Sequence, residues 1–251
     1  AYPRLGRGAG AAWNARNRKA AFEGASRLLA VSSYLADIAL DAGADPRRLS
    51  VHYQGVDTHW WTPAPNTAES CEEPVVLFVG ALSRLKGVDD LARASASLVG
   101  RHPHRLVLVG DGPLEAGLRE RAPAHVTFAG RLDREGVREW MRRAHLLVLP
   151  TKPTQGRQEA AGLVLLEAQA CGVPVVAYST GGTPEMIAPG ASMLTRERSP
   201  QSLAHAIDEA LAWSEDERAD RGAQCRAWVD KERSLRASTE QLRAIYADLT
   251  P

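Results

Sequence analysis

The feature that most constrains the fold is an alternation of short, wholly apolar runs with helical patterns, which begins near residue 74. Strands that are apolar on both faces are typical of a parallel sheet that helices cover on both sides. We therefore expect an α/β fold with strands at residues 74–80, 105–110, 125–130, 145–151 and 173–179, and helices at 88–100, 114–121, 133–144 and 162–171. Such sheets bind ligands at the carboxyl ends of their strands, so candidate site residues should lie there.

Residues 1–62 follow a different pattern, with a polar helix that contains several arginines, then a strand, a second helix and a second strand. The segment 54–74 is rich in Pro, Thr and acidic residues, which is typical of a linker between two packed units. Residues 200–250 predict two or three helices, the first of which opens on a capping serine followed by proline.

Composition argues against several classes of protein. The 251 residues carry a net charge of +1, which gives no reason to expect a nucleic acid as partner. The longest apolar runs are well short of the roughly 20 residues that a membrane-spanning helix needs. The cysteines Cys71, Cys171 and Cys225 lack the spacing of a metal site and are odd in number, so we expect inert thiols in a reducing cytoplasm.

Two glycine-containing turns follow predicted strands. In VGDGP, at 109–113, the third glycine of a dinucleotide fingerprint is missing and Glu115 takes its place, which argues against a nicotinamide or flavin cofactor. In VGALSRLKG, at 79–87, Arg84 and Lys86 lie just past a strand end, where two cations suit a phosphate or pyrophosphate. A simple tight turn and a solvated basic loop explain the same residues, so both alternatives stay open.

Two glutamates separated by seven residues stand out in the apolar segment 157–176. Glu159 precedes the predicted helix 162–171 and Glu167 lies within it, where an ionised carboxylate is costly unless it finds donors. The hydroxyls of a ribose can give two hydrogen bonds to one carboxylate, and the free amides near residues 161–163 can hold a phosphate. The structural alternative is that Glu159 caps the helix and Glu167 pairs with an arginine.

These segments, in this order, resemble glycosyltransferase family 4, the retaining nucleotide-sugar transferases of the GT-B fold. The resemblance extends from about residue 26 to the C-terminus, and its most specific part is EAAGLVLLEAQACGVPVVAYSTGGTPE at 159–185. That part looks like the E-x7-E signature of the family, followed by its Gly-Gly-x-x-Glu turn. The resemblance is also carried by residues 28–63, 79–94, 106–118 and 125–151.

The resemblance implies an α/β fold of GT-B type, in which two Rossmann-like domains face each other across a cleft. Residues 1–62 would be the end of the N-terminal, acceptor-side domain and the hinge, and residues 63–225 the Rossmann-like donor-binding domain. Residues 226–251 would form a C-terminal helix that crosses back toward the N-terminal domain. The chain would hold only a remnant of that domain, so we expect it to bind a donor more readily than it transfers sugar.

The resemblance also implies a role for each residue that matches a motif. Glu167 would hold the ribose of a nucleotide-diphosphate sugar, Glu159 would contact the donor sugar and the distal phosphate, and Lys86 would neutralise the diphosphate leaving group. The remaining residues of the implied nucleotide-sugar site are Gly80, Gly110, Gly130, Arg131, Leu132, Ala161, Gly162 and Leu163. Residues 130–132 would edge the base, the glycines at 80 and 110 would form turns beside the diphosphate, and the amides of 161–163 would hold its distal phosphate.

The sequence departs from the family pattern in three places. Ala81 stands where an arginine is common, and Arg84 is the candidate to reach the same phosphate from another backbone position. Ala160 and Ala161 replace the usual Gly-Phe pair of the signature. His145 stands where an aspartate is common, and we expect it to begin a strand and to have no ligand role.

The resemblance implies transfer of a sugar to an acceptor hydroxyl with retention of anomeric configuration, without a metal or other cofactor. Glu159, Lys86 and Arg84 would be the catalytic residues, since stabilising the charge on the leaving diphosphate is the protein's main contribution. The acidic pair at 89–90 lies in a predicted helix, and we expect it to bind no metal. These residues do not determine the base, the sugar or the acceptor.

Other functions stay open at this stage. The chain also fits another GT-B enzyme, such as a sugar phosphorylase or a sugar-nucleotide epimerase, or a module that binds a nucleotide sugar without catalysis. A Rossmann-like domain without a ligand would have no use for the two glutamates. Trp60 and Trp61, exposed beside the hinge, would suit a docking surface, and packing against the N-terminal domain explains them as well. The arginine-rich helix at 13–19 hints at peripheral contact with the inner face of a membrane, although a solvated helix face explains it better.

Overall fold

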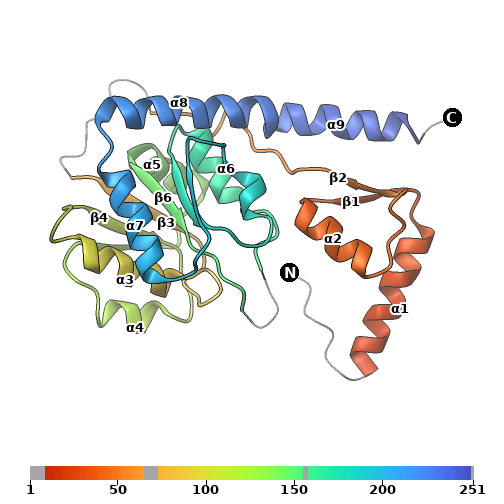
Figure 1. The fold of residues 1–251 in the computed structure, drawn as a ribbon, viewed down its shortest axis with the longest axis horizontal. Coiled ribbons are helices and arrows are strands. Elements are labelled where there is room, and N and C mark those ends of the chain that lie inside the picture. The colour runs from red at the N-terminus through yellow and green to blue at the C-terminus, as the bar shows by residue number, and fades with distance from the viewer. Residues whose placement is uncertain (1–8, 65–72, 155–157, 250–251) are drawn as a thin grey trace.

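The computed structural model describes residues 9–64, 73–154 and 158–249, without the side chains of residues 9–15. A six-stranded parallel sheet flanked by helices forms the larger unit, and a smaller N-terminal unit lies to one side of it (Figure 1). Cys71 and the middle of the predicted linker lie outside the described residues.

The large sheet has the strand order β5-β4-β3-β6-β7-β8, and all neighbouring strands are parallel. The strands are β3 (Val75–Val79), β4 (Arg105–Val109), β5 (Val126–Gly130), β6 (Leu146–Leu149), β7 (Val175–Tyr178) and β8 (Met193–Thr195). The first five confirm the predicted strands. The sequence does not predict β8, because a three-residue strand with a 38% exposed Leu194 contains no apolar run. The order runs outward in both directions from β3 and β6, which is the doubly wound arrangement of Rossmann-like folds.

Helices cover both faces of this sheet. They are α3 (Val88–Leu98), α4 (Glu115–Arg119), α5 (Arg134–Arg143), α6 (Leu163–Ala170), α7 (Pro200–Leu211) and α8 (Glu215–Glu232), with a short 3₁₀ helix η1 (Thr183–Met186) after β7. α3 packs on α7, and α6 packs on α8. Because crossovers between parallel strands are right-handed, the chain places α3 and α6 on opposite faces. The predicted parallel sheet with helices on both faces is therefore confirmed.

The central strands are buried on both faces, which is why their sequences are wholly apolar. Leu77, Phe78, Leu106, Leu108 and Leu147 have no exposed surface. Burying each such side chain contributes about 1.5–3 kcal/mol relative to leaving it exposed. The core therefore fixes the strand ends from which the functional loops start.

The N-terminal unit consists of α1 (Ala9–Gly24), β1 (Leu28–Ala30), α2 (Ser33–Asp41) and β2 (Leu49–Val51). β1 and β2 form a parallel two-stranded sheet of their own, separate from the larger sheet. This order of helix, strand, helix and strand is the one that the sequence predicts for residues before the hinge.

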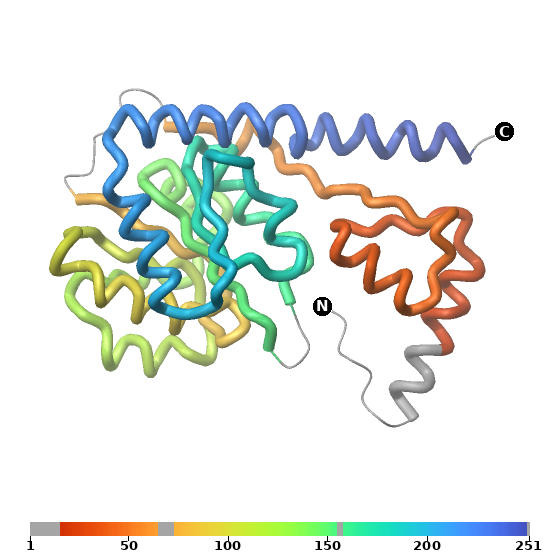
Figure 2. Tube along the Cα trace, in the orientation of Figure 1, coloured from red at the N-terminus to blue at the C-terminus, as the bar shows by residue number. Residues whose placement is uncertain are grey.

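Residues 54–63 are packed against the C-terminal helices and do not behave as a free linker. The N–H of Val56 donates to the carbonyl of Arg233, and its carbonyl accepts from the N–H of Leu235, both at 2.9 Å. The guanidinium of Arg226 in α8 donates to two carbonyl oxygens of the segment, at 2.6 and 2.8 Å. Figure 2 shows the segment running along the helical pair that ends the chain.

The last helix, α9 (Leu235–Ala247), follows α8 after a break at Arg233. Ser234 caps it by accepting from the N–H of Ala237 at 3.2 Å. α9 continues the line of α8 beyond the large sheet, toward the side on which β1 and β2 lie (Figure 1). The predicted division at residues 225–226 falls inside α8, and the three-part domain division stays a prediction. No helix in the described ranges is long and apolar enough to cross a membrane.

The prediction that both hinge tryptophans are exposed is wrong. Trp61 is 3% exposed and belongs to the hydrophobic core. Trp60 is partly buried, and the guanidinium groups of Arg138 and Arg134 lie 4.0 and 4.8 Å from the centroid of its ring. Both indoles therefore hold the hinge against α5 and offer no free docking surface.

The described cysteines are buried. Burial raises the pKa of the Cys171 thiol to about 12 and that of the Cys225 thiol to about 11. Both side chains are therefore protonated thiols at neutral pH, and a thiol is a poor nucleophile.

Candidate functional site

The main candidate site is a cleft at the carboxyl edge of the large sheet, between β3 and β6. These strands are neighbours, but the chain leaves them toward opposite edges of the sheet, so a crevice opens between the loops that follow them. The cleft has a volume of about 550 Å³. It is lined by the end of β3, the loop before α3, the start of α5, the segment leading into α6, and Gln54 and Trp61 from the hinge.

Lys86 and Glu159 form an ion pair within this cleft. Lys86 Nζ lies 2.5 Å from Glu159 Oε2, to which Thr151 Oγ1 also donates at 3.2 Å. The two side chains are 25% and 12% exposed, so the pair is largely buried. The loop that carries Lys86 fits closely against the end of β6 because it ends at Gly87, where φ is +67° and a Cβ would lie 2.0 Å from the carbonyl oxygen of Pro150.

Glu167, in contrast, has no partner for its carboxylate among the described residues. It lies in α6, lines the cleft and is partly buried. Burial raises the pKa of its carboxyl, and the positive charge of Arg134 opposes this shift. A carboxylate that is partly removed from water and accepts no hydrogen bond is unfavourable. The site therefore offers an acceptor that a ligand with suitable donors would satisfy.

α6 begins without a side-chain cap from the described residues, which leaves its first backbone amides available to a ligand. Gly162 is the N-cap, with φ +71°, and it has no side chain to supply an acceptor. Glu159 pairs with Lys86 and caps nothing, while Glu167 forms no ion pair in the described chain. Neither structural alternative from the sequence therefore describes the site. The positive end of an eight-residue helix instead faces the cleft, where it suits an anion.

The structure brings most of the predicted site residues into this one cleft. Those that line it are Gly80, Lys86, Leu132, Glu159, Ala161, Gly162, Leu163 and Glu167. Their places agree with a shared site, and their individual roles stay predictions.

Four predicted residues do not line the cleft: Arg84, Gly110, Gly130 and Arg131. Arg84 and Arg131 are exposed. Gly110 supports the cleft from behind, because a Cβ there would lie 2.0 Å from the carbonyl oxygen of Gly80. Its N–H in turn donates to the carbonyl of Gly130 at 2.8 Å. Gly110 therefore lets adjacent strand ends approach closely, whereas a Cβ on Gly130 would meet open space. Any contact of these two glycines with a ligand remains a prediction.

Sequence reasoning missed Arg134 and Asp133, which also line the cleft. Asp133 caps α5 by accepting from the N–H of Gly136 at 2.9 Å, which fixes where the helix begins. Arg134 is the first residue of α5, and its guanidinium lies 5.5 Å from the centroid of the Trp61 ring. The sequence signal for Arg134 is a cation two residues after the segment 130–132, which is expected to edge the base.

Asp89 and Asp90 lie in α3, as predicted, and cations already engage them. Lys152 Nζ lies 3.3 Å from Asp89 Oδ2 and 2.9 Å from Asp90 Oδ1. Arg93 lies 2.6 Å from Asp90, which also accepts from the hydroxyl of Tyr178 at 3.2 Å. In the described parts of the chain, no group of three or more His, Cys, Asp or Glu side chains is placed to hold a metal ion.

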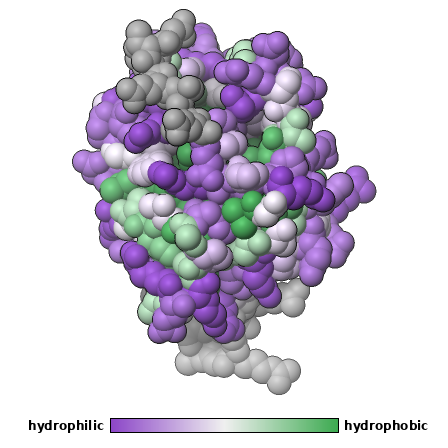
Figure 3. Space-filling model, turned by 90° about the vertical axis from the view of Figure 1, so that its left-hand side faces the viewer, coloured by the Kyte–Doolittle hydropathy of each residue, from purple (hydrophilic) through white to green (hydrophobic). Residues whose placement is uncertain are grey.

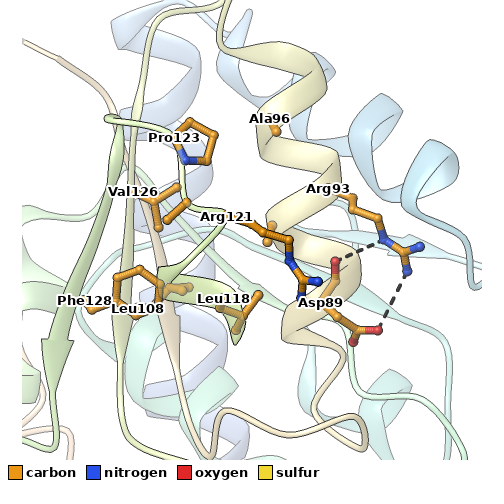
Figure 4. Close-up of a pocket in the computed structure, with 11 residues that line it drawn as sticks. Asp89, Arg93, Ala96, Leu108, Leu118, Arg121, Pro123, Val126 and Phe128 are labelled. Atoms are coloured by element: carbon orange, nitrogen blue, oxygen red, sulfur yellow. Dashed lines mark hydrogen bonds and ion pairs between the residues drawn. The ribbon is translucent and has the colours of Figure 1, made fainter. Parts of the chain in front are cut away.

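A second hollow, of about 510 Å³, lies between α3, α4 and the edge strand β5. Leu118, Val126 and Phe128 give it apolar walls, and Asp89 and Arg93 interact beside it (Figure 4). Figure 3 shows the side of the molecule on which α3 and α4 lie, where hydrophobic surface gathers within a hydrophilic surround. Among the described residues, this hollow and the cleft share no lining residue, and none of the predicted site residues lies in the hollow.

Comparison with known proteins identifies the family. Residues 73–212 match the family model described as Glycosyl transferases group 1. The D-inositol 3-phosphate glycosyltransferase 2 of Catenulispora acidiphila is 38% identical over 171 residues, which cover 60% of this chain and 39% of that protein. The GDP-mannose-dependent monoacylated alpha-(1-6)-phosphatidylinositol monomannoside mannosyltransferase of Corynebacterium glutamicum is 32% identical over 203 residues, which cover 75% of this chain and 53% of that protein.

Solved structures give the same fold. HepE of Anabaena, crystallised in complex with UDP, matches with a TM-score of 0.80 and 23% identity over 94% of this chain and 68% of that chain. At this identity the match shows the fold alone, which is that of the GT-B glycosyltransferases. The chain spans 39% and 53% of the length of the two curated relatives. The family model covers more than half of the chain, and the resemblance inferred from the motifs is confirmed: this chain belongs to the glycosyl transferases group 1.

Proposed function

We propose that this chain supplies the donor-binding half of a glycosyltransferase that moves a sugar from a nucleotide-diphosphate sugar to an acceptor hydroxyl, with retention of anomeric configuration. Family membership supports the reaction class, and the complex of HepE with UDP supports a nucleotide donor. The observation that carries the proposal is Glu167, a partly buried carboxylate in the cleft without a donor from the described chain.

In the proposed complex, the two hydroxyls of the ribose donate to the carboxylate of Glu167. Hydrogen bonds to a charged group contribute about 1.5–3 kcal/mol, so this contact can anchor the nucleotide. The positive charge of Arg134 favours the ionised form of Glu167, which is the form that accepts both hydroxyls. Arg134 itself is oriented by the rings of Trp60 and Trp61.

The diphosphate would lie between Lys86 and the N-terminus of α6. In the free chain Lys86 pairs with Glu159, so both side chains are held at the cleft before a donor arrives. A diphosphate gives Lys86 a second anion, and Glu159 can then accept from hydroxyls of the donor sugar. Lys86 and the amides of α6, with Arg84 if it reaches the phosphate, would supply positive charge to the leaving group without a metal ion.

The proposed reaction breaks the bond between the anomeric carbon and the diphosphate oxygen and forms a bond from that carbon to the acceptor oxygen. Retention requires the acceptor to approach on the face that the diphosphate leaves, and the acceptor proton then passes to a phosphate oxygen. Positioning two reactants in this way contributes up to about 7–11 kcal/mol. In this proposal the acceptor is positioned by the N-terminal domain of the whole protein.

Isothermal titration calorimetry with UDP, GDP and ADP in metal-free buffer tests the donor-binding claim. We expect one diphosphate to bind, and Glu167→Gln to weaken its binding by about 1.5–3 kcal/mol, since the neutral amide replaces a charged acceptor. Glu209→Gln is the matched control, because Glu209 is exposed on α7, and it should leave the Kd unchanged. The proposal is wrong if no diphosphate binds at millimolar concentration, or if both variants weaken binding equally.

Retention is tested separately, on the whole protein. Proton NMR of the first product formed from an α-linked donor should show the α anomer, because the proposed attack occurs on the face that the diphosphate leaves. A β-anomeric first product would overturn the stereochemical part of the proposal and leave the donor site standing.

A further inference from the structure

The turn at residues 181–185, which follows β7, makes none of the donor contacts proposed above. It begins with Gly181 and Gly182 and continues into η1, which contains Glu185. The turn lies between the segment that carries Glu159 and the N-terminal unit, and it contacts both.

Glu185 accepts hydrogen bonds from the N-terminal unit and the hinge. Its Oε2 accepts from the N–H of Ser33 at 2.7 Å and the hydroxyl of Tyr53 at 2.8 Å, and its Oε1 accepts from the N–H of Tyr34 at 3.1 Å. Ser33 and Tyr34 are the first residues of α2, whose own N-cap is Ser32. Burial alone would raise the pKa of Glu185, but these hydrogen bonds outweigh it and lower the pKa. A carboxylate of the large unit thus completes the cap of a helix in the small one.

The other side of the turn rests on the backbone that carries Glu159. The N–H of Gly182 donates to the carbonyl of Glu159 at 3.0 Å. A Cβ on Gly181 would lie 2.1 Å from the same oxygen, so the two backbones are in direct contact. Thr180 Oγ1 donates to the carbonyl of Thr151 at 2.7 Å, and the hydroxyl of Thr151 donates to the carboxylate of Glu159. The turn therefore contacts the backbone of Glu159 directly and reaches its carboxylate through Thr151.

The hinge and the C-terminal helices hold the same cluster. The guanidinium of Arg233 lies 3.8 Å from the centroid of the Tyr53 ring and donates to the carbonyl of Glu185 at 3.2 Å. Ser238 Oγ, in α9, donates to the carbonyl of Tyr53 at 2.9 Å. Glu185 is therefore the point at which the N-terminal unit, the hinge, the α8–α9 break and the cleft are connected.

We propose that Glu185 is a positioning residue that couples the docking of the N-terminal unit on the larger unit to the position of Glu159 in the cleft. The inference rests on the proposed function, because Glu185 has this task only if Glu159 contacts the donor sugar. While Glu185 holds α2, the turn keeps the backbone of Glu159 in place. Without its carboxylate, the turn loses its anchor on the N-terminal unit, and Glu159 is free to shift. The nucleotide end of the cleft, where Glu167 lies on α6, does not depend on this anchor.

The test compares a nucleoside diphosphate with its sugar nucleotide, because in the proposed site only the sugar reaches Glu159. The probes are UDP with UDP-glucose and GDP with GDP-mannose, titrated by calorimetry into the chain, Glu185→Gln and the control Glu209→Gln. We expect Glu185→Gln to keep the Kd of the diphosphate within about two-fold and to weaken the sugar nucleotide about five- to ten-fold, the size of one ordinary hydrogen bond. Glu209→Gln should change neither Kd.

Tyr53→Phe is the second variant, in case Glu185→Gln fails to fold. It removes the hydroxyl that donates to Glu185 and keeps the ring on which the guanidinium of Arg233 lies. We expect it to weaken the sugar nucleotide about two- to three-fold and to spare the diphosphate, because the backbone donors of α2 remain in place.

Equal weakening of diphosphate and sugar nucleotide in both variants would mean that Glu185 only supports the fold. Kd values that both stay unchanged would mean that Glu159 does not follow the position of the N-terminal unit. Either result overturns the inference. If the unaltered chain binds no diphosphate at all, the proposed function fails instead, and the two failures are thereby distinguished.

Discussion

Glu167 and Glu185 are both partly buried glutamates of the larger unit, but their surroundings are opposite. The carboxylate of Glu185 accepts from two backbone amides and a tyrosine hydroxyl, which lower its pKa despite burial. That of Glu167 accepts from no described residue, and burial raises its pKa. The fold itself supplies hydrogen-bond donors to the carboxylate of Glu185, whereas the carboxylate of Glu167 is left for a ligand to satisfy.

This difference separates a contact that holds the molecule together from one that costs it stability. A glutamate kept in an unfavourable place is expected where function requires it, since binding sites commonly reduce stability. Glu159 is intermediate, because a cation of the same cleft neutralises it until a donor binds. The three glutamates therefore form a series, in which the number of protein donors decreases as the proposed contact with the nucleotide increases.

The largest effect should come from removing the cation of the cleft. Lys86→Met leaves Glu159, which is 12% exposed, without a cation and with the hydroxyl of Thr151 as its remaining side-chain donor in the described chain. Removing one member of a buried ion pair costs about 3–5 kcal/mol, and because Lys86 is 25% exposed we expect about 3 kcal/mol in urea denaturation. Donor binding should weaken as well.

Lys231→Met is the matched control, because Lys231 is 82% exposed and pairs with Glu232 on the surface. Its free energy of unfolding should change by about 0–1 kcal/mol. Equal losses in the two variants would contradict the account of the cleft as a place where charges are largely removed from water.

The second prediction concerns replacement of each of the two glutamates, Glu167 and Glu185, by glutamine. Glu185→Gln should lower the free energy of unfolding by about 1–3 kcal/mol, because a charged acceptor of protein donors is lost. Glu167→Gln should leave it unchanged or raise it by up to about 1 kcal/mol, because an unsatisfied carboxylate is removed. Urea denaturation of both variants at pH 7 measures the difference, and a large loss in Glu167→Gln would show that a protein donor serves Glu167 after all.

The pH dependence of stability should have opposite signs at the two sites. The raised pKa of Glu167 means that the folded state binds the proton more tightly, so its contribution falls as pH rises from the ordinary value of 4.5 through the raised one. The lowered pKa of Glu185 means that its contribution is present above 4.5 and is lost as pH falls through the lowered value. Denaturation of each Gln variant between pH 3 and 7, compared with the unaltered chain, should give slopes of opposite sign, and slopes of the same sign would break the comparison.

The smallest expected effect comes from a histidine pair remote from both glutamates. Ser95 Oγ lies 2.8 Å from Nε2 of His104 and of His125, and burial lowers the pKa of both rings. A histidine whose pKa is lowered by folding destabilises the fold as pH falls below its unfolded value of 6.5. His104→Gln should therefore reduce the loss of stability between pH 7 and 5. If His104→Gln loses as much stability between pH 7 and 5 as the unaltered chain, other groups cause that loss. In either case, the loss has to be subtracted before the pH dependence is attributed to the two glutamates.

The parallel sheet could be predicted because β3, β6, β7 and most of β4 are buried on both faces and are therefore apolar in sequence, and β5 follows as a partly buried edge strand. The sequence correctly predicts Glu159 in the segment before α6 and Glu167 within it. His145 also precedes a strand, as expected, and its Nδ1 accepts from the N–H of Val75 at 3.1 Å. Such features depend on a few neighbouring residues, and local sequence is enough to predict them.

What could not be predicted depends on contacts between distant segments. Lys86 pairs with Glu159 across 73 residues only because β3 lies beside β6, and the strand order is not visible in the hydrophobic pattern. The contacts of Glu185 with α2 join residues 151 and 152 positions apart. The sequence analysis expects Trp61 to be exposed beside the hinge, but α5 and α8 cover it from elsewhere in the chain.

We propose above all that Glu167 lacks a protein donor because the ribose hydroxyls of a nucleotide donate hydrogen bonds to its carboxylate. The most direct measurement is the pKa of Glu167 by NMR of carbon-13-labelled glutamate, with Glu167→Gln to assign the signal, in the free chain and with saturating nucleoside diphosphate. We expect a pKa above the ordinary 4.5 in the free chain that falls to or below 4.5 on binding, because donors to the carboxylate favour its ionised form. A diphosphate that binds and leaves the pKa of Glu167 unchanged would contradict the proposal.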